Sequence, residues 1–307
     1  MKIAIHGLGR MGMQIARKLA ESGDHQVIAH NRSQEPIDEA VSYGAQGATS
    51  KQDVVAAFGD ERVVIWVMLP TGVAEEEITA WLPLVPEGSI MISGGNSDYR
   101  ITRELNLKVK QAGKHLIDIG VSGGVWGYQN GFPLMCGSDD RAVYETIVPV
   151  LDTLVRPGGM HAHFGPSGAG HYVKMTHNAI EYGMMQSLGE GYRLLHDGPY
   201  GDSIDLATAG DLWQHHSVIT SWLNELSAMA LRENPGLDGV SGYVAESGEA
   251  RWAIETAHQL GMTLPAIEAA MDVRVKSQAG ETNFATKVVA AQRNKFGNHN
   301  LNGEGAA

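Results

Sequence analysis

The segment 170–183 carries polar side chains at a spacing that suits acid–base chemistry. The polar residues stand at i, i+3, i+4, i+7 and i+8, and they are Lys174, His177, Asn178, Glu181 and Tyr182. At about 100° per residue these positions share one face of a helix whose other side is apolar. A lysine removed from water loses its proton readily and can act as a base, and a glutamate can return a proton. A solvated surface helix is the plainer alternative, but such faces favour Glu, Lys, Gln and Arg over this mixture.

A glycine-rich loop near the N-terminus predicts a dinucleotide site. The loop reads Gly7-Leu8-Gly9-Arg10-Met11-Gly12, directly after the apolar run Ile3-Ala4-Ile5 and at the start of a helical pattern. In G-x-G-x-x-G the glycines permit a tight turn and close approach of a pyrophosphate, which the helix N-terminus attracts. A glycine turn that only packs is the alternative.

The end of the second apolar run bears on the choice of cofactor. NAD enzymes usually place Asp or Glu there for the ribose 2′-hydroxyl. This chain has His30-Asn31-Arg32-Ser33 and no acid before Glu35. Because Arg32 can pair with a 2′-phosphate and Asn31 and Ser33 can add hydrogen bonds, NADP is favoured, with NAD as the alternative. Further cofactor contacts are expected from Met68, Leu69, Pro70 and Asn96.

Apolar runs that alternate with helical patterns predict the elements that position these residues. The runs are Ile3–Ile5, Val27–Ala29, Val63–Leu69, Ser89–Ser93, His115–Ile119 and Pro133–Cys136. This alternation predicts an α/β, Rossmann-like, doubly wound domain over residues 1–165. An all-α substrate and dimerisation domain is expected over 166–307, with helical stretches at 169–196, 203–231, 243–260, 264–278 and 283–295.

Two glycine-containing loops follow strand ends in the first domain. They are Gly94-Gly95-Asn96-Ser97 and Gly120-Val121-Ser122-Gly123-Gly124. Doubly wound sheets bind ligands at the carboxyl ends of their strands, so both loops are candidates to line a site. Ordinary turn chemistry is the alternative for either loop taken alone.

Composition excludes several function classes. The 307 residues carry a formal net charge of −12, which argues against nonspecific nucleic-acid binding. The single cysteine and the lack of a metal-ligand cluster argue against a disulfide framework or a metal site. No membrane-length apolar stretch or signal pattern is found, so a cytoplasmic protein is expected. The polar, glycine-rich tail 298–307 is expected to be disordered unless something docks it.

Together these motifs resemble 6-phosphogluconate dehydrogenase, within the β-hydroxyacid dehydrogenase family. The matching stretches are the loop 7–12, the loops 94–100 and 120–124, the helix 168–183 and the tail 292–299. The likeness covers nearly the whole chain, whose length is typical of the short branch of the family.

The resemblance implies roles for individual residues. Lys174 matches the general base and Glu181 the general acid. The residues that match positions lining the sugar acid are Asn96, Ser122, Gly123, Gly124, His177, Asn178 and Tyr182. Arg274 matches an arginine that holds the substrate phosphate, and Arg293 and His299 match tail residues that reach the phosphate in a neighbouring subunit. The resemblance therefore implies a homodimer or homotetramer.

The chain departs from the long enzymes at several positions. Ser247 replaces a phosphate-binding lysine, Glu249-Ala250-Arg251 differs, Thr220 stands where arginine is common, and Val125-Trp126 replaces an acidic pair. These departures concern phosphate affinity rather than the chemistry.

Three functions follow from these patterns, in order of preference. The first is oxidative decarboxylation of 6-phosphogluconate to ribulose 5-phosphate with NADP or NAD. The second is a 3-hydroxyisobutyrate-type dehydrogenase that oxidises without decarboxylating. Such an enzyme has no use for the combination of Glu181, Arg274, Arg293 and His299. The third is a dinucleotide-binding module without catalysis, which gives no reason for a Lys–Glu pair on one helix face.

Overall fold

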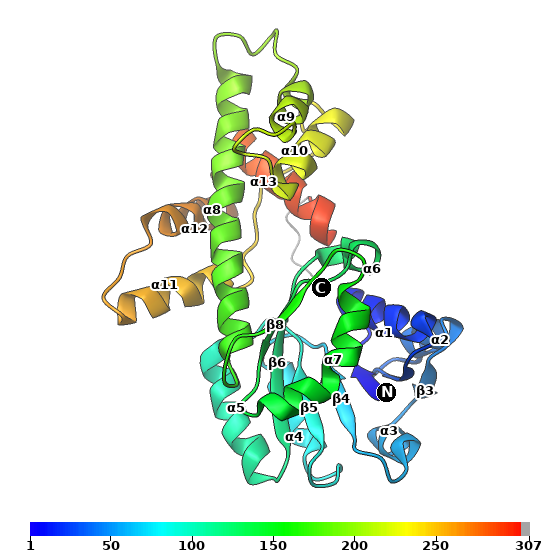
Figure 1. Cartoon of the computed structure of the whole chain (residues 1–307). Coiled ribbons are helices and arrows are strands. Elements are labelled where there is room, and N and C mark those ends of the chain that lie inside the picture. Colours follow the sequence, from blue (N-terminus) through cyan, green and yellow to red (C-terminus); the bar gives the residue numbers. More distant parts are fainter. Residues whose placement is uncertain (302–307) are drawn as a thin grey trace. The chain divides into compact units, whose positions relative to one another are not determined.

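The chain forms two compact units, which are described here one at a time. The computed structural model describes residues 1–301 (Figure 1). The first unit comprises Met1–Met175, and the second begins at Thr176. The predicted fold class, a Rossmann-like domain followed by a helical domain, is confirmed.

The first unit is built on an eight-stranded sheet with the order β3-β2-β1-β4-β5-β6-β7-β8. The strands are β1 Lys2–His6, β2 Gln26–His30, β3 Gln46–Ala48, β4 Val64–Val67, β5 Ile90–Ser93, β6 His115–Val121, β7 Leu134–Gly137 and β8 His161–His163. All neighbouring pairs are parallel except β6 and β7, which are antiparallel. The edge strands β3 and β8 have three residues each, too few to form the apolar runs by which the other strands are predicted.

Helices cover both faces of this sheet (Figure 1). They are α1 Arg10–Ser22, α2 Gln34–Ser42, α3 Lys51–Phe58, α4 Val73–Trp81, α5 Tyr99–Gln111, the short η1 Gly124–Trp126 and α6 Gly127–Asn130, and α7 Arg141–Val155. Because side chains alternate along a strand, Ile3 and Ile5 pack into one core with α1, α2 and α7, whereas Ala4 packs into another with α3, α4 and α5. Burial on both faces explains why the strands are almost continuously apolar.

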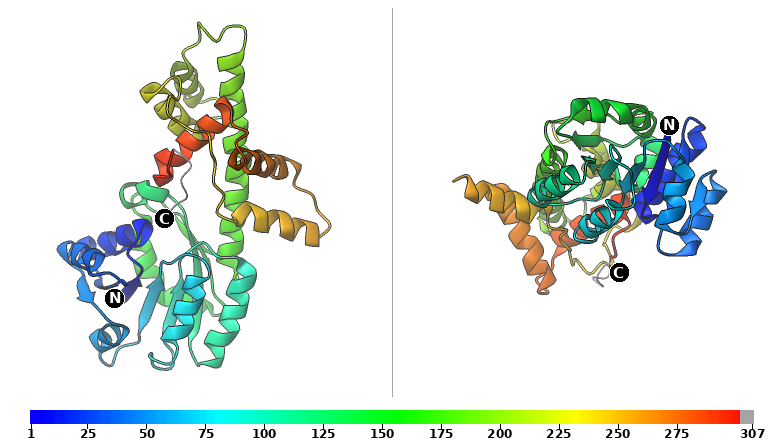
Figure 2. Two further views of the ribbon diagram at one scale, coloured as in Figure 1. Left: turned by 180° about the vertical axis from the view of Figure 1, so that it is seen from behind. Right: turned by 90° about the horizontal axis from the view of Figure 1, so that it is seen from below.

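The described part of the second unit consists of helices and loops, without a strand. It contains most of α8 Ala169–Asp197, then α9 Leu206–Gln214, α10 Trp222–Glu233, α11 Glu249–Gln259, α12 Pro265–Gln278 and α13 Phe284–Gly297. Tyr182, Met185 and Tyr192 of α8 pack with α9, α10, α12 and α13 in one apolar core. The views in Figure 2 show α11 and α12 as a helical pair joined by a short loop.

Two of the predicted helical stretches are wrong in extent. The stretch 203–231 is two helices, because the chain turns between α9 and α10, where His216 has φ 61° and the Ser221 hydroxyl caps α10 by accepting from Asn224 N. The stretch 243–260 begins as a helix only at Glu249, after Gly248 at φ 97°. Apolar periodicity alone does not show such interruptions.

The domain boundary at 165 stays a proposal. The division into compact units falls after Met175, inside α8, because the first turns of that helix pack against β6. Residues 166–175 thus belong with the sheet by their contacts.

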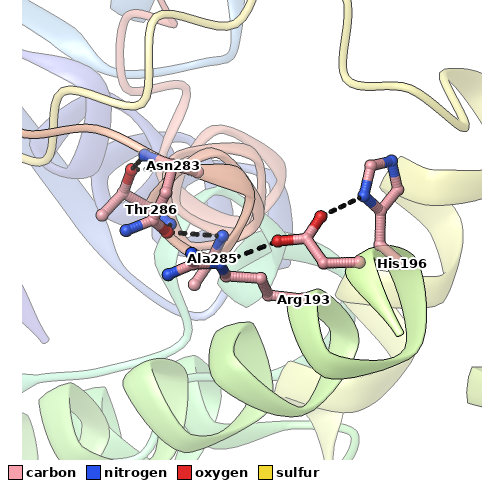
Figure 3. Close-up of polar contacts among 6 residues, drawn as sticks. Arg193, His196, Asn283, Ala285 and Thr286 are labelled. Atoms are coloured by element: carbon pink, nitrogen blue, oxygen red, sulfur yellow. Dashed lines mark hydrogen bonds and ion pairs between the residues drawn. The ribbon is translucent and has the colours of Figure 1, made fainter. Parts of the chain in front are cut away.

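Local polar contacts hold the C-terminal end of α8 and the end of the described chain. Near the end of α8, Asp197 pairs with Arg193 and His196, and the cap of α13 lies beside them, with Asn283 accepting from Ala285 N at 2.9 Å (Figure 3). The carbonyl of Leu301 accepts from Ser241 N and Oγ, at 3.1 and 2.8 Å. The tail predicted to be disordered is thus docked as far as Leu301, and residues 302–307 lie outside the described part.

Among the described helices, none combines the length and apolarity that a bilayer crossing requires.

Candidate active site

The glycine loop has the tight geometry that a dinucleotide site needs. Gly7 directly follows β1 and has φ 97°, and a Cβ there would lie 2.6 Å from the carbonyl oxygen of Met68. A Cβ on Gly12 would lie 1.9 Å from the carbonyl oxygen of Gly7. Helix α1 begins immediately after Gly9, so its unpaired N–H groups face the loop. The loop fits a pyrophosphate, with Met68, Leu69 and Pro70 next to it at the end of β4.

The segment after β2 is tied to the same loop. Asn31 Oδ1 accepts from Leu8 N at 3.2 Å, and Asn31 Nδ2 donates to Ser33 Oγ at 3.4 Å. Arg32 is exposed between them. The structure therefore brings Asn31, Arg32 and Ser33 to the glycine loop, as a site for the ribose end of the cofactor requires.

Beneath this loop lies a buried histidine pair that sequence reasoning missed. His6 and His30 end the neighbouring strands β1 and β2, and their ring centroids are 4.8 Å apart. Trp81 Nε1 donates to His6 Nδ1 at 3.0 Å, and Glu77 Oε2 lies 3.9 Å from His6 Nε2. Burial, and then the neighbouring His30, lowers the pKa of His6 to about 4. The only signal in the sequence is that each histidine directly precedes a ligand loop.

We expect the burial of His6 to make folding sensitive to mild acid. The unfolded chain binds a proton at His6 near pH 6.5 but the folded chain only near pH 4, so the free energy of unfolding falls as pH drops through that window. One such group contributes up to about 1.4 kcal/mol per pH unit. In His6→Gln, the amide oxygen can still accept from Trp81, and urea unfolding should show a shallower loss of stability across the window. An equally steep loss in the variant would contradict this reading.

A buried carboxylate anchors the start of α8. Asp118 of β6 is fully buried and accepts from Gly168 N at 2.6 Å and from His171 N at 2.8 Å. His171 Nδ1 lies 2.7 Å from Thr102 Oγ1. Because these groups hold the first turn of α8 to the sheet, they fix the part of the helix that carries Lys174. Asp118 was missed because one acid inside an apolar run resembles any strand residue.

Lys174 is placed at the end of β6. It is 6% exposed, and its Cβ packs so closely on Gly120 that a Cβ there would lie 2.3 Å away. Ser122, Gly123 and Gly124 follow directly, with Gly123 at φ 106°. The lysine stem is thus out of water and beside a predicted substrate loop, where its amine can serve as a base.

The other loop expected to line the site also has restricted geometry. A Cβ on Gly94 would lie 1.8 Å from Trp66 Nε1, and one on Gly95 would lie 2.3 Å from the carbonyl oxygen of Leu69. The hydroxyl of Thr71 donates to the carbonyl of Asn96. Asn96 is therefore held beside the chain that follows β4, within the first unit.

In the second unit, α8 presents the predicted polar face as a connected set. His177 Nδ1 lies 2.9 Å from Asn178 Oδ1 and 3.8 Å from Glu181 Oε2. Asn178 Nδ2 donates to Glu249 Oε1 at 3.0 Å. Asn178 and Tyr182 are buried, so this face is not a solvated helix surface.

Arg274 lies against this face. Its guanidinium carbon is 3.2 Å from the centroid of the Tyr182 ring, and its Nη1 donates to the carbonyl of Ala245 at 3.3 Å. Tyr182 accepts from Ser247 N at 3.3 Å. Burial, together with the nearby charge of Arg293, lowers the pKa of Arg274 to about 10, although Tyr182, Glu181 and Glu249 oppose the shift.

Arg293 is the second buried cation of this unit. It is 7% exposed on α13, and burial lowers its pKa against the pull of Tyr182, Glu181 and Glu249. Within residues 1–301, neither Arg293 nor Arg274 has a carboxylate oxygen within 4.0 Å. Two buried guanidiniums that have no paired carboxylate can bind an anion.

His299 and Thr220 make contacts with residues close to them in the sequence. The ring of His299 packs edge-on against Phe296, and its carbonyl accepts from Asn294 Nδ2 at 2.9 Å. Thr220 is exposed in the loop before α10, where its hydroxyl donates to the carbonyl of Ser217. Among the described residues, no group of three His, Cys, Asp or Glu side chains could hold a metal ion.

Both units match known family domains. Residues 2–163 match the NAD binding domain of 6-phosphogluconate dehydrogenase, and residues 170–302 match the 6-phosphogluconate dehydrogenase C-terminal domain. The first unit is thus an NAD(P)-binding domain, as the glycine loop predicts.

Individual proteins agree with these matches. A Bacillus subtilis protein whose name assigns it provisionally to the 6-phosphogluconate dehydrogenases is 37% identical over 97% of this chain and 98% of its own. A Haloferax volcanii protein named as an NAD(+)-dependent, decarboxylating 6-phosphogluconate dehydrogenase is 34% identical over 98% of both. The solved structure of the 3-hydroxyisobutyrate dehydrogenase of Mycobacterium tuberculosis has a TM-score of 0.72 at 22% identity, over 94% of this chain and 97% of that one, and so shares the fold. The chain belongs to the 6-phosphogluconate dehydrogenase family of NAD(P)-dependent dehydrogenases.

Proposed function

We propose that the protein oxidatively decarboxylates 6-phosphogluconate to ribulose 5-phosphate and carbon dioxide, with reduction of NADP or NAD. The observation that carries this proposal is the pair of buried, carboxylate-free guanidiniums of Arg274 and Arg293 in the unit that carries Glu181. A small unphosphorylated acid has no second anionic group for such a site. The names of the two close relatives support the same substrate.

We propose substrate-binding roles for the residues that match the pattern of the family. Ser122, Gly123 and Gly124 would bind its carboxylate end with backbone N–H groups and a hydroxyl, and Asn96 would add a hydrogen bond. His177 and Asn178 would bind the hydroxyls. The phosphate would be bound by Tyr182, Arg274, Arg293 and His299.

The oxidation needs a base at the 3-hydroxyl, and Lys174 is proposed for it. The neutral amine takes the hydroxyl proton while C3 gives up its hydride. A bound nicotinamide supplies the hydride acceptor. Lys174, now protonated, donates a hydrogen bond to the new C3 ketone and polarises it.

The resulting β-keto acid loses its carboxyl group as carbon dioxide, and the electron pair forms an enediol between C2 and C3. Glu181 is proposed to protonate C1 of the shortened chain, which gives ribulose 5-phosphate. Lys174 and Glu181 are seven residues apart on α8, about 10 Å along its axis, a span that suits a short sugar acid. His177 contacts Glu181 and would orient it.

NADP is proposed as the preferred cofactor. The exposed Arg32 follows β2, where an NAD enzyme usually carries an acid, and its guanidinium would pair with a 2′-phosphate. Because Arg293 lowers the pKa of Arg274 in the same chain, Arg293 is proposed here for the phosphate of its own chain. The role of His299 toward a neighbouring subunit, and a homodimer or homotetramer, likewise stay proposals.

A matrix of initial rates tests the function and the cofactor together. We expect 6-phosphogluconate to be turned over and gluconate to be turned over far less, since gluconate leaves the two arginines without an anion. We expect NADP to give the higher kcat/KM. Turnover of small unphosphorylated 3-hydroxy acids, with none of 6-phosphogluconate, would favour the 3-hydroxyisobutyrate-type dehydrogenase instead. Tight cofactor binding without any turnover would indicate a binding module.

A further inference from the structure

A third buried side chain of the second unit carries a charge, and this charge is negative. Glu249 is 2% exposed at the first position of α11, and it was singled out in the sequence only as a departure from the long enzymes. Its charge acts on both guanidiniums, since it opposes the lowering of the pKa of Arg274 and of Arg293. The carboxylate of Glu249 repels any anion that the two arginines bind, so its presence here requires a reason.

The segment 245–249 holds Glu249 in this place through successive contacts. The carbonyl of Ala245 accepts from Arg274, Ser247 N donates to the hydroxyl of Tyr182, and Glu249 Oε1 accepts from Asn178 Nδ2. Gly248, at φ 97°, provides the turn into α11, whose N-terminus favours an anion.

The same contacts bring the charges together on one helix face. Asn178 and Tyr182 are one turn apart on α8, so their side chains are neighbours. Glu249 accepts a hydrogen bond from Asn178, and the guanidinium carbon of Arg274 lies 3.2 Å from the centroid of the Tyr182 ring. Glu249 and Arg274 thus contact neighbouring side chains of α8, and they form no ion pair with each other.

We propose that Glu249 sets the anion affinity of the Arg274–Arg293 site, acting as a built-in counter-charge that weakens the binding of a phosphate dianion. The proposal rests on the function above, in which these arginines bind the substrate phosphate. In the free protein, Glu249 offsets two buried positive charges. When a phosphate binds, the same carboxylate repels it, so the arginines release the phosphorylated product as well as take up the substrate.

Affinity for inorganic phosphate, measured by thermal shift and calorimetry at constant ionic strength, tests this directly. In Glu249→Gln, the amide oxygen can still accept from Asn178, but the charge is gone. We expect phosphate to bind this variant on the order of tenfold more tightly than the wild-type protein. Glu249→Asp keeps the charge and should bind phosphate with nearly wild-type affinity. Glu255→Gln, an exposed change of the same charge on the same helix, is the matched control and should change nothing.

Unchanged or weaker phosphate binding in Glu249→Gln would overturn the proposal, as would equal tightening in Glu249→Asp, because geometry rather than charge would then be responsible. Since the readout is binding, it separates this proposal from the proposed function. Tighter phosphate binding without turnover of 6-phosphogluconate supports the counter-charge and removes the function. Turnover with phosphate affinity unaltered in Glu249→Gln removes only the counter-charge.

Discussion

Lys174→Met should lower kcat for 6-phosphogluconate by about 10³-fold, with the fold and cofactor binding retained. Methionine keeps an unbranched stem that can pack against Gly120, but it cannot accept or donate the proton. The measurement is steady-state turnover, together with thermal unfolding and NADP titration of the same preparation.

Lys276→Met is the matched control for this change. Lys276 is exposed on α12, where it pairs with Asp272, so its replacement should leave kcat within about twofold of the wild-type value. Normal activity in Lys174→Met would remove Lys174 from its proposed role. A variant that neither folds nor binds cofactor would make Lys174 a structural residue instead.

Glu181→Gln should separate the two halves of the reaction. Glutamine keeps the size of the side chain but has no acidic proton for C1, so the formation of ribulose 5-phosphate should slow by about 10²-fold or more. Hydride transfer depends on Lys174 rather than on Glu181, so this substitution should slow hydride transfer less than it slows the formation of ribulose 5-phosphate. In a single turnover, NADPH should therefore form early, while the sugar product follows slowly.

The same helix offers a control for Glu181. Glu190 is exposed on α8 and accepts from Gln186 at 2.7 Å, so Glu190→Gln should behave like the wild-type protein in both phases. If NADPH and ribulose 5-phosphate slow together in Glu181→Gln, the residue acts before or during hydride transfer, and its role as the acid at C1 is wrong.

Much of the fold could be predicted, because its signals are local. The glycine loop, the apolar runs and the polar face of α8 each lie within a short stretch of sequence. The edge strands β3 and β8 could not be predicted, since three residues carry no periodicity, and the break between α9 and α10 depends on one turn and one cap.

The groups that support the site depend on tertiary contacts and were missed for that reason. Asp118 becomes an anchor only when β6 meets the start of α8, and Glu249 becomes a counter-charge only when α11 meets Asn178. The His6–His30 pair forms only because β1 and β2 are neighbours in register. No spacing along the chain shows these three pairings.

The most direct test of the proposed reaction is its stoichiometry. The purified protein should be given 6-phosphogluconate labelled at its carboxyl carbon, together with NADP, and the labelled carbon dioxide and NADPH should be counted in the same sample. The account predicts equal amounts of the two and ribulose 5-phosphate as the sugar product. NADPH without labelled carbon dioxide would show a dehydrogenase that does not decarboxylate and would contradict the roles proposed for Lys174 and Glu181 in the second half of the reaction.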